Sequence, residues 1–386
     1  MSDQSPLPPP FTEEHEQLRE AIRRFVETEL APHAREWEDE KWFPNSVFDR
    51  LAELGWLGLK YPEEYGGEGG DYVHDAVFTE ELSRCGSGGL AAGIGAHIGI
   101  ATPPIWKFGT EDQKQRFLAP AIKGEKIAAL GITEPDAGSD VASIRTVARR
   151  ENGGYVVNGS KTFITNGVRA DYVVTAVKTT SEGGHHGISF LVIEKGMDGF
   201  SVSRKLEKMG WHASDTGELA FQDVFVPEEN LLGEENKGFY LIMANFQWER
   251  LLMSLGAVGA MQRLLETTIA YAKERKSFGR PLTGHQTIRH KITDMAIKLE
   301  RGRAVTYNAL RLFVNGHDAI REVTTAKLIT QRDCFEVADE AVQIHGGAGY
   351  MREYDVERAA RDARLGPIGG GTDEIMREIL AKQLGL

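Results

Sequence analysis

Residues 154–167 read GYVVNGSKTFITNG, and this stretch decides the fold class. It is rich in β-branched and aromatic residues and contains an Asn-Gly pair at its end, which is typical of a strand that leads into a tight turn. Short runs of the same kind follow: DYVVTAVKT, ISFLVIEKG, FSVSRK and GELAFQDVFVP. Their spacing predicts an antiparallel β domain, a sandwich or a barrel, over residues 126–234.

Helical patterns flank this β region on both sides. Before it, FTEEHEQLREAIRRFVETEL, PNSVFDRLAELGWLGL and YVHDAVFTEELSRC space their apolar residues as amphipathic helices do. After it, residues 237–276, 287–316 and 324–347 form amphipathic runs longer than an average globular helix, which indicates a bundle. We predict a mainly α chain with a central β domain: an N-terminal all-α domain (1–125), the middle β domain (126–234) and a C-terminal helical-bundle domain (235–386).

Composition and charge narrow the class of protein. The 386 residues include 45 Lys and Arg against 57 Asp and Glu, a formal net charge of −12. This balance argues against a nucleic-acid partner, which usually meets a basic surface. Cys85 and Cys334 lack the spacing of a disulfide framework or a zinc site, so we expect neither, and we predict no bound metal.

Two segments bear on location. The uncharged residues 88–106 are rich in Gly and contain two Pro, which favours a buried small-residue helix over a membrane span. The N-terminal MSDQSPLPPP lacks the features of a secretory or transit peptide, so we predict a flexible Pro-rich tail and a cytoplasmic protein.

Two loops offer local donors to an anionic ligand. In ITEPDAGSD (132–140), Gly138 and Ser139 present backbone N–H and hydroxyl groups, although the same residues suit a plain turn. ERKSFGRPL (274–282) is the clearest cation cluster, and a solvated helix end is its alternative interpretation.

Glu249 is the most informative single residue. At about 100° per residue, Ile242, Phe246 and Met253 lie within about 60° of it on the predicted helix. A carboxyl group on such an apolar stripe must have an ionic or hydrogen-bonding partner, be protonated, or take part in catalysis. The residues alone favour a structural acid over a catalytic one. The Gly-rich QIHGGAGY and IGGGTDEI follow helices rather than strands, so neither is a dinucleotide-binding fingerprint.

Six motifs in order resemble the acyl-CoA dehydrogenase family: ITEPDAGSD, NGSKTFITNG, KMGWHASDT, ERKSFGRPL, QIHGGAGY and GGGTDEI. The likeness is collinear from Phe11 to the C-terminus. It implies an N-terminal helical domain, a middle β-barrel or sandwich and a C-terminal four-helix bundle. It also implies one FAD per subunit in a homotetramer, a dimer of dimers.

The resemblance assigns binding roles residue by residue. The implied FAD contacts are Leu130, Ile132, Thr133, Gly138, Ser139, Phe163, Ile164, Thr165, Arg275, Phe278, Gln286, Gln343, Ile344, His345, Gly346, Gly347, Thr372, Asp373 and Glu374. Those from Arg275 to Gly347 would reach the FAD of a neighbouring subunit. The implied acyl-CoA contacts are Ser139, Tyr240, Gln247, Arg250, Gly370 and Gly371.

The position of the catalytic base separates branches of the family. Some members carry a Glu just before the Gly-Thr of the last motif, where this chain has Gly370. The chain resembles the long-chain and isovaleryl branches, which place the base on the long helix at the Glu of an E-R pair. That Glu matches Glu249 in FQWERLL, so the resemblance makes Glu249 the expected base.

The implied reaction is α,β-dehydrogenation of an acyl-CoA to the trans-2-enoyl-CoA. Glu249 would take the α-proton while the β-hydride passes to flavin N5. The resemblance suggests a medium-chain, long-chain or branched acyl group, with electron-transfer flavoprotein as the acceptor. Two alternatives stay open: an acyl-CoA oxidase-like flavoprotein that uses O₂, and a non-catalytic homologue that binds acyl-CoA.

Overall fold

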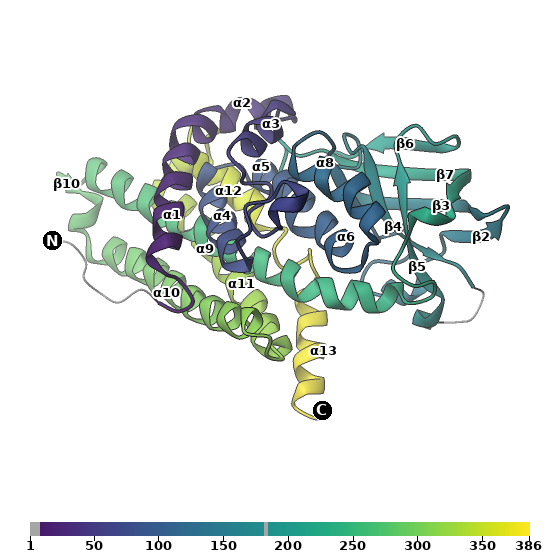
Figure 1. Cartoon of the computed structure of the whole chain (residues 1–386). Coiled ribbons are helices and arrows are strands. Elements are labelled where there is room, and N and C mark those ends of the chain that lie inside the picture. Colours follow the sequence, from purple (N-terminus) through teal and green to yellow (C-terminus); the bar gives the residue numbers. More distant parts are fainter. Residues whose placement is uncertain (1–7, 181–183) are drawn as a thin grey trace.

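The computed structural model describes residues 8–180 and 184–386, so most of the predicted Pro-rich tail lies outside the described residues. Helices occupy both ends of the sequence, and a β region lies between them in sequence and to one side of them in space (Figure 1). The predicted order of α, then β, then α is therefore confirmed.

The N-terminal region is a set of short helices. Three of them continue into π-helical turns, at Val26–Leu30, Ala96–Ala101 and Lys114–Leu118, which the amphipathic pattern did not predict. The uncharged stretch 88–106 forms helices, as predicted, and is mostly buried. The α-helices are α1 (Glu13–Phe25), α2 (Ala34–Glu40), α3 (Ser46–Glu53), α4 (Tyr72–Leu82), α5 (Gly88–Gly95), α6 (Thr102–Phe108), α7 (Glu111–Gln113) and α8 (Ala119–Ile122).

The middle region contains one sheet whose strands run in the order β6-β7-β3-β2-β4-β5-β8. Most neighbours are antiparallel, but β1 pairs in parallel with β4, and β2 meets β4 in parallel at Val147 and Lys178. The prediction of an antiparallel domain misses these two pairings: β3 runs opposite to β2, and the turn after β3 returns the chain to the direction of β1 and β2 as β4 begins. The strands are β1 (Ala128–Gly131), β2 (Val147–Glu151), β3 (Gly154–Thr165), β4 (Tyr172–Lys178), β5 (Ile188–Glu194), β6 (Phe200–Lys205), β7 (Thr216–Pro227) and β8 (Leu231–Leu232).

Strand β4 is buried on both faces, which explains its nearly continuous apolar sequence. Tyr172 and Val174 belong to a core shared with Phe117 of the helical region. Val173 and Val177 face the opposite way, into a core formed within the β region. The sheet is thus covered by N-terminal helices on one side and by its own strands on the other.

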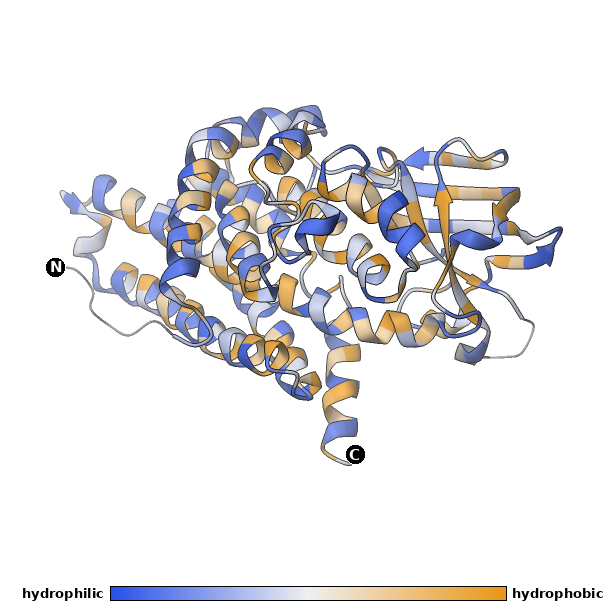
Figure 2. Cartoon of the chain, viewed as in Figure 1, coloured by the Kyte–Doolittle hydropathy of each residue, from blue (hydrophilic) through white to orange (hydrophobic). Residues whose placement is uncertain are grey.

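The C-terminal region is built on three long helices that pack against one another. Helix α12 packs on α11, and α13 also contacts α11 and then projects from the body of the molecule (Figure 1). Apolar residues recur along these helices and also along the projecting α13 (Figure 2). The elements are α9 (Gly238–Glu274), a ribbon of β9 (Lys276–Ser277) and β10 (Arg280–Pro281), α10 (Gln286–Val314), α11 (Ile320–His345), α12 (Asp355–Ala363) and α13 (Asp373–Gln383).

Both cysteines are buried and free, in agreement with the expectation of no disulfide. Within residues 8–180 and 184–386, no helix has the length and apolar character needed to cross a bilayer.

A buried ion pair of the β region contacts the N-terminal region through its arginine. Arg169 Nε donates to Asp215 Oδ1 at 2.6 Å, and Arg169 Nη1 donates to the Phe43 carbonyl at 3.0 Å. The guanidinium also lies over the Trp42 ring, 3.8 Å from its centroid. Both charged side chains are almost wholly excluded from water, so each depends on the other.

We expect Asp215→Ala to lower the free energy of unfolding by about 3–5 kcal/mol, because it leaves the Arg169 charge buried and unpaired. Urea unfolding followed by circular dichroism measures the effect. Glu207→Ala is the control, since the Lys41–Glu207 pair, which joins the N-terminal region to the β region, is exposed and contributes about 1 kcal/mol or less. Equal losses in the two variants would contradict this account.

Candidate active site

Glu249 lies in the middle of α9 and is buried, with 8% of its surface exposed. Asn245, one turn earlier, donates from Nδ2 to Glu249 Oε1 at 2.6 Å. Burial raises the pKa of Glu249 to about 7, against the opposing effects of this hydrogen bond and of the Arg250 charge. The carboxyl group is therefore poised to exchange a proton near neutral pH.

The π-helical segment Ala96–Ala101 supports this arrangement from the N-terminal region. Its Ile100 carbonyl accepts a hydrogen bond from Asn245 Nδ2 at 3.1 Å, so the amide is held between that carbonyl and the Glu249 carboxyl group. The Ile98 carbonyl of the same segment accepts from Lys60 Nζ at 3.0 Å. π-Helical turns often occur at functional sites, and this one fixes the donor that faces Glu249.

A turn of two glycines lies beside Arg250, the next residue on α9. Gly370 and Gly371 have φ of +63° and +97°, a region that favours glycine. Arg250 Nε donates to the Gly370 carbonyl at 3.4 Å, and Lys327 Nζ donates to the Gly371 carbonyl at 2.6 Å. The turn is thus held from two sides by buried cations.

No side chain fits at position 370 without rearrangement. A Cβ atom there would lie 2.4 Å from Sδ of Met253, which is one turn after Glu249 on α9. Met253 of α9 therefore occupies the space that a side chain at position 370, such as the glutamate of other branches, would need. Gly370 thus lies beside Met253, which is one turn from Glu249 on α9.

The segments predicted to line the flavin lie side by side. Lys161 is wholly buried, and its Nζ donates to Glu134 Oε1 at 2.7 Å and to the Ile132 carbonyl at 3.0 Å. The Thr162 N–H donates to the Thr133 carbonyl at 2.9 Å. These bonds join the ITEPDAGSD loop to strand β3, and Leu130 and Ile132 lie at the β1 end of the same unit.

Strand β3 contains a bulge just after Lys161. Its register against β7 shifts between Lys161 and Ile164, and Phe163 has φ of +60°, which is rare for a bulky residue. The bulge leaves the Phe163 ring 68% exposed while Ile164 is buried. Gly138 and Ser139 are exposed, and a Cβ at Gly138 would meet no atom within 4 Å. An exposed apolar ring beside open backbone donors fits a flat polar ligand such as a flavin.

The segments predicted to reach a neighbouring subunit's FAD are distributed differently. Arg275, Phe278 and Gln286 are exposed at the end of the bundle that lies away from the β region (Figure 1). Phe278, 95% exposed at φ +49°, forms the tip of the β9–β10 turn. The structure does not bring these residues to Glu249 within one chain, which is the arrangement expected of residues that serve a second subunit.

The QIHGG segment has both buried and exposed members. Ile344 and His345 have buried side chains, and the His345 ring stacks on Tyr271 with centroids 4.0 Å apart. Only their backbones are therefore available to a ligand. Gln343, Gly346 and Gly347 are exposed.

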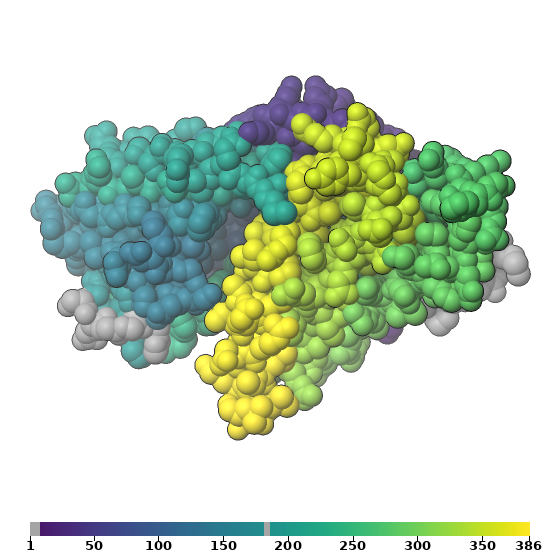
Figure 3. Space-filling view, turned by 180° about the vertical axis from the view of Figure 1, so that it is seen from behind, coloured from purple at the N-terminus to yellow at the C-terminus, as the bar shows by residue number. Residues whose placement is uncertain are grey.

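The GGGTDEI segment begins α13. The Thr372 hydroxyl caps the helix by accepting from the Ile375 N–H at 3.3 Å. Asp373 is buried and forms an ion pair with Arg332, whereas Glu374 is exposed. The C-terminal residues, yellow in Figure 3, border the teal β region along a furrow.

Two predicted substrate contacts are not on the Glu249 face. Tyr240 and Gln247 precede Glu249 on α9 by spacings that place them about half a turn round the helix from it. Tyr240 is 54% exposed and lines a surface hollow of about 590 Å³ with Phe108 and Lys237. Their roles stay predictions, and if they bind substrate they contact a part remote from the reacting carbons.

Sequence reasoning missed four residues that build the site: Asn245, Lys161, Glu134 and Lys327. Asn245 had a signal, because a polar residue four positions before a buried acid shares its helix face. Lys161 and Lys327 had none, because their partners come from distant segments.

A helical domain, a β domain and a helical bundle around a buried carboxyl group are the layout of one class of flavoenzymes. Comparisons with known proteins identify the family. Models of the N-terminal, middle and C-terminal domains of acyl-CoA dehydrogenase match residues 12–125, 129–224 and 236–385. The chain belongs to the acyl-CoA dehydrogenase family and is an enzyme of that family.

Named relatives match over nearly the whole chain. The mitochondrial long-chain specific acyl-CoA dehydrogenase of Mus musculus is 40% identical, covering 97% of this chain and 87% of its own. The mitochondrial isovaleryl-CoA dehydrogenase of Solanum tuberosum is 39% identical, covering 97% and 91%. A probable acyl-CoA dehydrogenase structure from Mycobacterium abscessus is 48% identical with a TM-score of 0.94, covering 97% and 99%. Both branches that the sequence resembled are thus among its relatives.

The expected cofactor is confirmed at the level of the family. Acyl-CoA dehydrogenase homologues are FAD-dependent, and solved neighbours include FAD complexes. The bulge at Phe163 and the open backbone at Gly138 fit that group, as described above.

The raised pKa of Glu249 predicts a pH-dependent stability. The folded pKa of about 7 lies above the ordinary value of 4.5, so stability falls as the pH rises from about 4.5 to about 7. We expect Glu249→Gln to remove this loss and to be more stable than the native chain by about 3 kcal/mol at pH 8. At pH 4 the two proteins should be equal. Thermal unfolding at both pH values, with exposed Glu300→Gln as control, measures this difference, and an equal gain at both would contradict it.

Proposed function

We propose that Glu249 is the base that removes the α-proton of an acyl-CoA thioester. The observation that supports this is the buried carboxyl group with a pKa of about 7, one residue from an arginine that holds the Gly370–Gly371 turn. The α C–H of a thioester is weakly acidic, so its removal needs a basic carboxylate held in a dry site. The family supplies the reaction class, acyl-CoA dehydrogenation with FAD.

The chain's own residues orient and protect this proton transfer. When bound, FAD supplies the hydride acceptor for the β-carbon. Asn245 holds one carboxyl oxygen of Glu249, which leaves Oε2 to face the substrate. Arg250 and Lys327 anchor the carbonyls of Gly370 and Gly371, and this holds in place the turn that carries the Gly370 N–H, the proposed donor to the thioester carbonyl.

The remaining assignments belong to the same proposal. The FAD would be held by the 130–139 and 163–165 segments of one chain and by Arg275, Phe278, Gln286 and the 343–347 segment of another, with residues 372–374 nearby. Ser139, Tyr240 and Gln247 would contact acyl-CoA. A medium-chain, long-chain or branched acyl group, a homotetramer in the cytoplasm and electron-transfer flavoprotein as acceptor stay predictions from the resemblance.

The base assignment is tested by Glu249→Gln in the FAD-loaded protein mixed anaerobically with acyl-CoAs from four carbons to long chains. We expect flavin bleaching to slow by about a thousandfold or more, because a general base contributes factors of this order and here begins the reaction. Glu300→Gln, an exposed acid on α10, should bleach at the native rate. Unchanged bleaching in Glu249→Gln would exclude this residue as the base.

A second measurement separates dehydrogenase from oxidase. Hydrogen peroxide released at the rate of turnover in air would favour the O₂-using alternative, and a protein that binds acyl-CoA without any bleaching would favour the non-catalytic one.

Asn245 is predicted to set the pH range of the reaction. Its hydrogen bond favours the ionised Glu249, so Asn245→Leu should raise the pKa of Glu249 further. We expect the rising limb of kcat/KM, near pH 7 in the native enzyme, to move up by about one pH unit or more. Asn245→Gln, which keeps an amide donor, should move the limb less. An unmoved limb in Asn245→Leu would show that Asn245 does not tune the base.

A further inference from the structure

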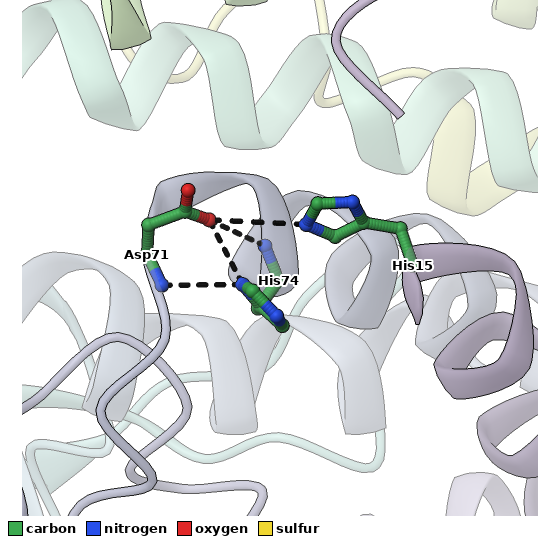
Figure 4. Close-up of side chains that lie close together, drawn as sticks. All are labelled: His15, Asp71 and His74. Carbon is green, nitrogen blue, oxygen red and sulfur yellow. Dashed lines mark hydrogen bonds and ion pairs between the residues drawn. The ribbon is translucent and has the colours of Figure 1, made fainter. Parts of the chain in front are cut away.

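Three side chains outside the active site converge between the starts of α1 and α4. His15 belongs to α1, and Asp71 and His74 belong to the first turn of α4 (Figure 4). One ligand atom from each lies within 4.8 Å of the others. Figure 4 shows both rings directed at the Asp71 carboxylate.

Each group also has a role in capping its helix. His15 occupies the third position of α1, with Nδ1 2.8 Å from the Thr12 hydroxyl. His74 occupies the third position of α4, with Nδ1 2.9 Å from Asp71 Oδ1. Asp71 is the N-cap of α4 and accepts from the Val73 N–H at 2.8 Å. These bonds account for Nδ1 of His15 but leave its Nε2 unused.

His15 Nε2 is the feature that capping does not explain. The residue is only 6% exposed, and this nitrogen has no hydrogen-bond partner. It faces Asp71 Oδ1 across 4.0 Å, a gap too long for a hydrogen bond. A buried polar atom without a partner is costly, and here it points at a carboxylate and a second imidazole.

We propose that His15 Nε2, Asp71 Oδ1 and His74 Nδ1 form a binding site for a divalent transition-metal ion of the zinc type. Two imidazoles and a carboxylate are a common zinc ligand set. The ligand atoms need to move closer together around an ion, and the Asp71 side chain, 60% exposed, has room to do so. Its exposure also leaves the fourth position open to water.

The other nitrogen of each imidazole already has an acceptor in reach. With the metal on Nε2, His15 Nδ1 would carry the proton and donate to the Thr12 hydroxyl at 2.8 Å, giving up the bond that it accepts from the Thr12 N–H at 3.1 Å. With the metal on Nδ1, His74 would give up the bond that it accepts from the Asp71 N–H at 3.2 Å, and its Nε2–H would face Glu14 Oε1 at 3.6 Å. Such outer partners orient imidazole ligands and increase their basicity. Burial lowers the pKa of His15 and favours its neutral, metal-binding form, whereas the hydrogen bond to Asp71 raises the pKa of His74, so a metal ion must displace a proton there.

The ion would tie the first helix of the fold to α4, which packs against α9. The site therefore has a structural rather than a catalytic consequence. The sequence did not suggest it, because His15 is far from residues 71–74 in the chain and each histidine has the position of a helix-cap residue.

Substitutions at the cap positions separate metal binding from capping. Asp71→Asn keeps an equally good N-cap, and His74→Gln keeps a residue suited to the capping box, but each removes a ligand. The FAD-loaded protein, freed of metal with EDTA, is titrated with Zn²⁺ alone by calorimetry. We expect one zinc per native chain, binding weakened about tenfold or more in each variant, and unchanged binding in His33→Gln, an exposed histidine.

Two readouts decide the proposal. Zn²⁺ should raise the Tm of the native protein and of His33→Gln but not of Asp71→Asn or His74→Gln, and Co²⁺ should give the visible absorption of a four-coordinate site only in the first two. The proposal would be overturned if the native protein showed no saturable zinc binding. It would also be overturned if Asp71→Asn and His74→Gln both bound zinc as tightly as the native protein.

Discussion

The site depends on keeping one carboxylate out of water without neutralising it. Glu249 lies on an apolar face of α9, where an ionised group is costly. Its hydrogen-bond partner is a neutral amide, Asn245, rather than a cation in contact. This partial compensation leaves its pKa near 7. A stronger hydrogen-bonding or ionic partner would keep Glu249 ionised as a structural acid. The absence of any partner would keep it protonated.

Other buried charges show what full compensation looks like. Lys161 meets the Glu134 carboxylate at 2.7 Å, and Arg169 meets Asp215 at 2.6 Å. Lys60 and Asp75 form a third buried pair. Each of these pairs joins two segments and serves the fold. Glu249 differs because, among the described residues, no cation is paired with it, and this contrast supports its proposed role as a base more strongly than its place on an apolar helix face does.

The sequence predicted the layout of the chain because its signals are local. Apolar periodicity identified the long helices, and β-branched runs identified the strands. The sequence did not predict the parallel β1–β4 pairing, because strand pairing is decided by tertiary contacts. The π-helical turn at 96–101 escaped because its carbonyls are bonded by side chains of other helices, such as Asn245. Glu249 was suspected from its apolar stripe, but only the resemblance to a known family favoured a catalytic role.

The distribution of cations bears on how an acidic chain binds phosphate-bearing ligands. The cations nearest the site are committed to carbonyls: Arg250 to Gly370, Lys327 to Gly371 and Lys161 to Ile132. They shape the backbone and have little capacity left for phosphate. Under the proposed function, the backbone donors around Gly138 would serve as anion contacts within one chain. The exposed cations Arg275 and Arg280 lie at the far end of α9 and, under the same proposal, would serve a second subunit.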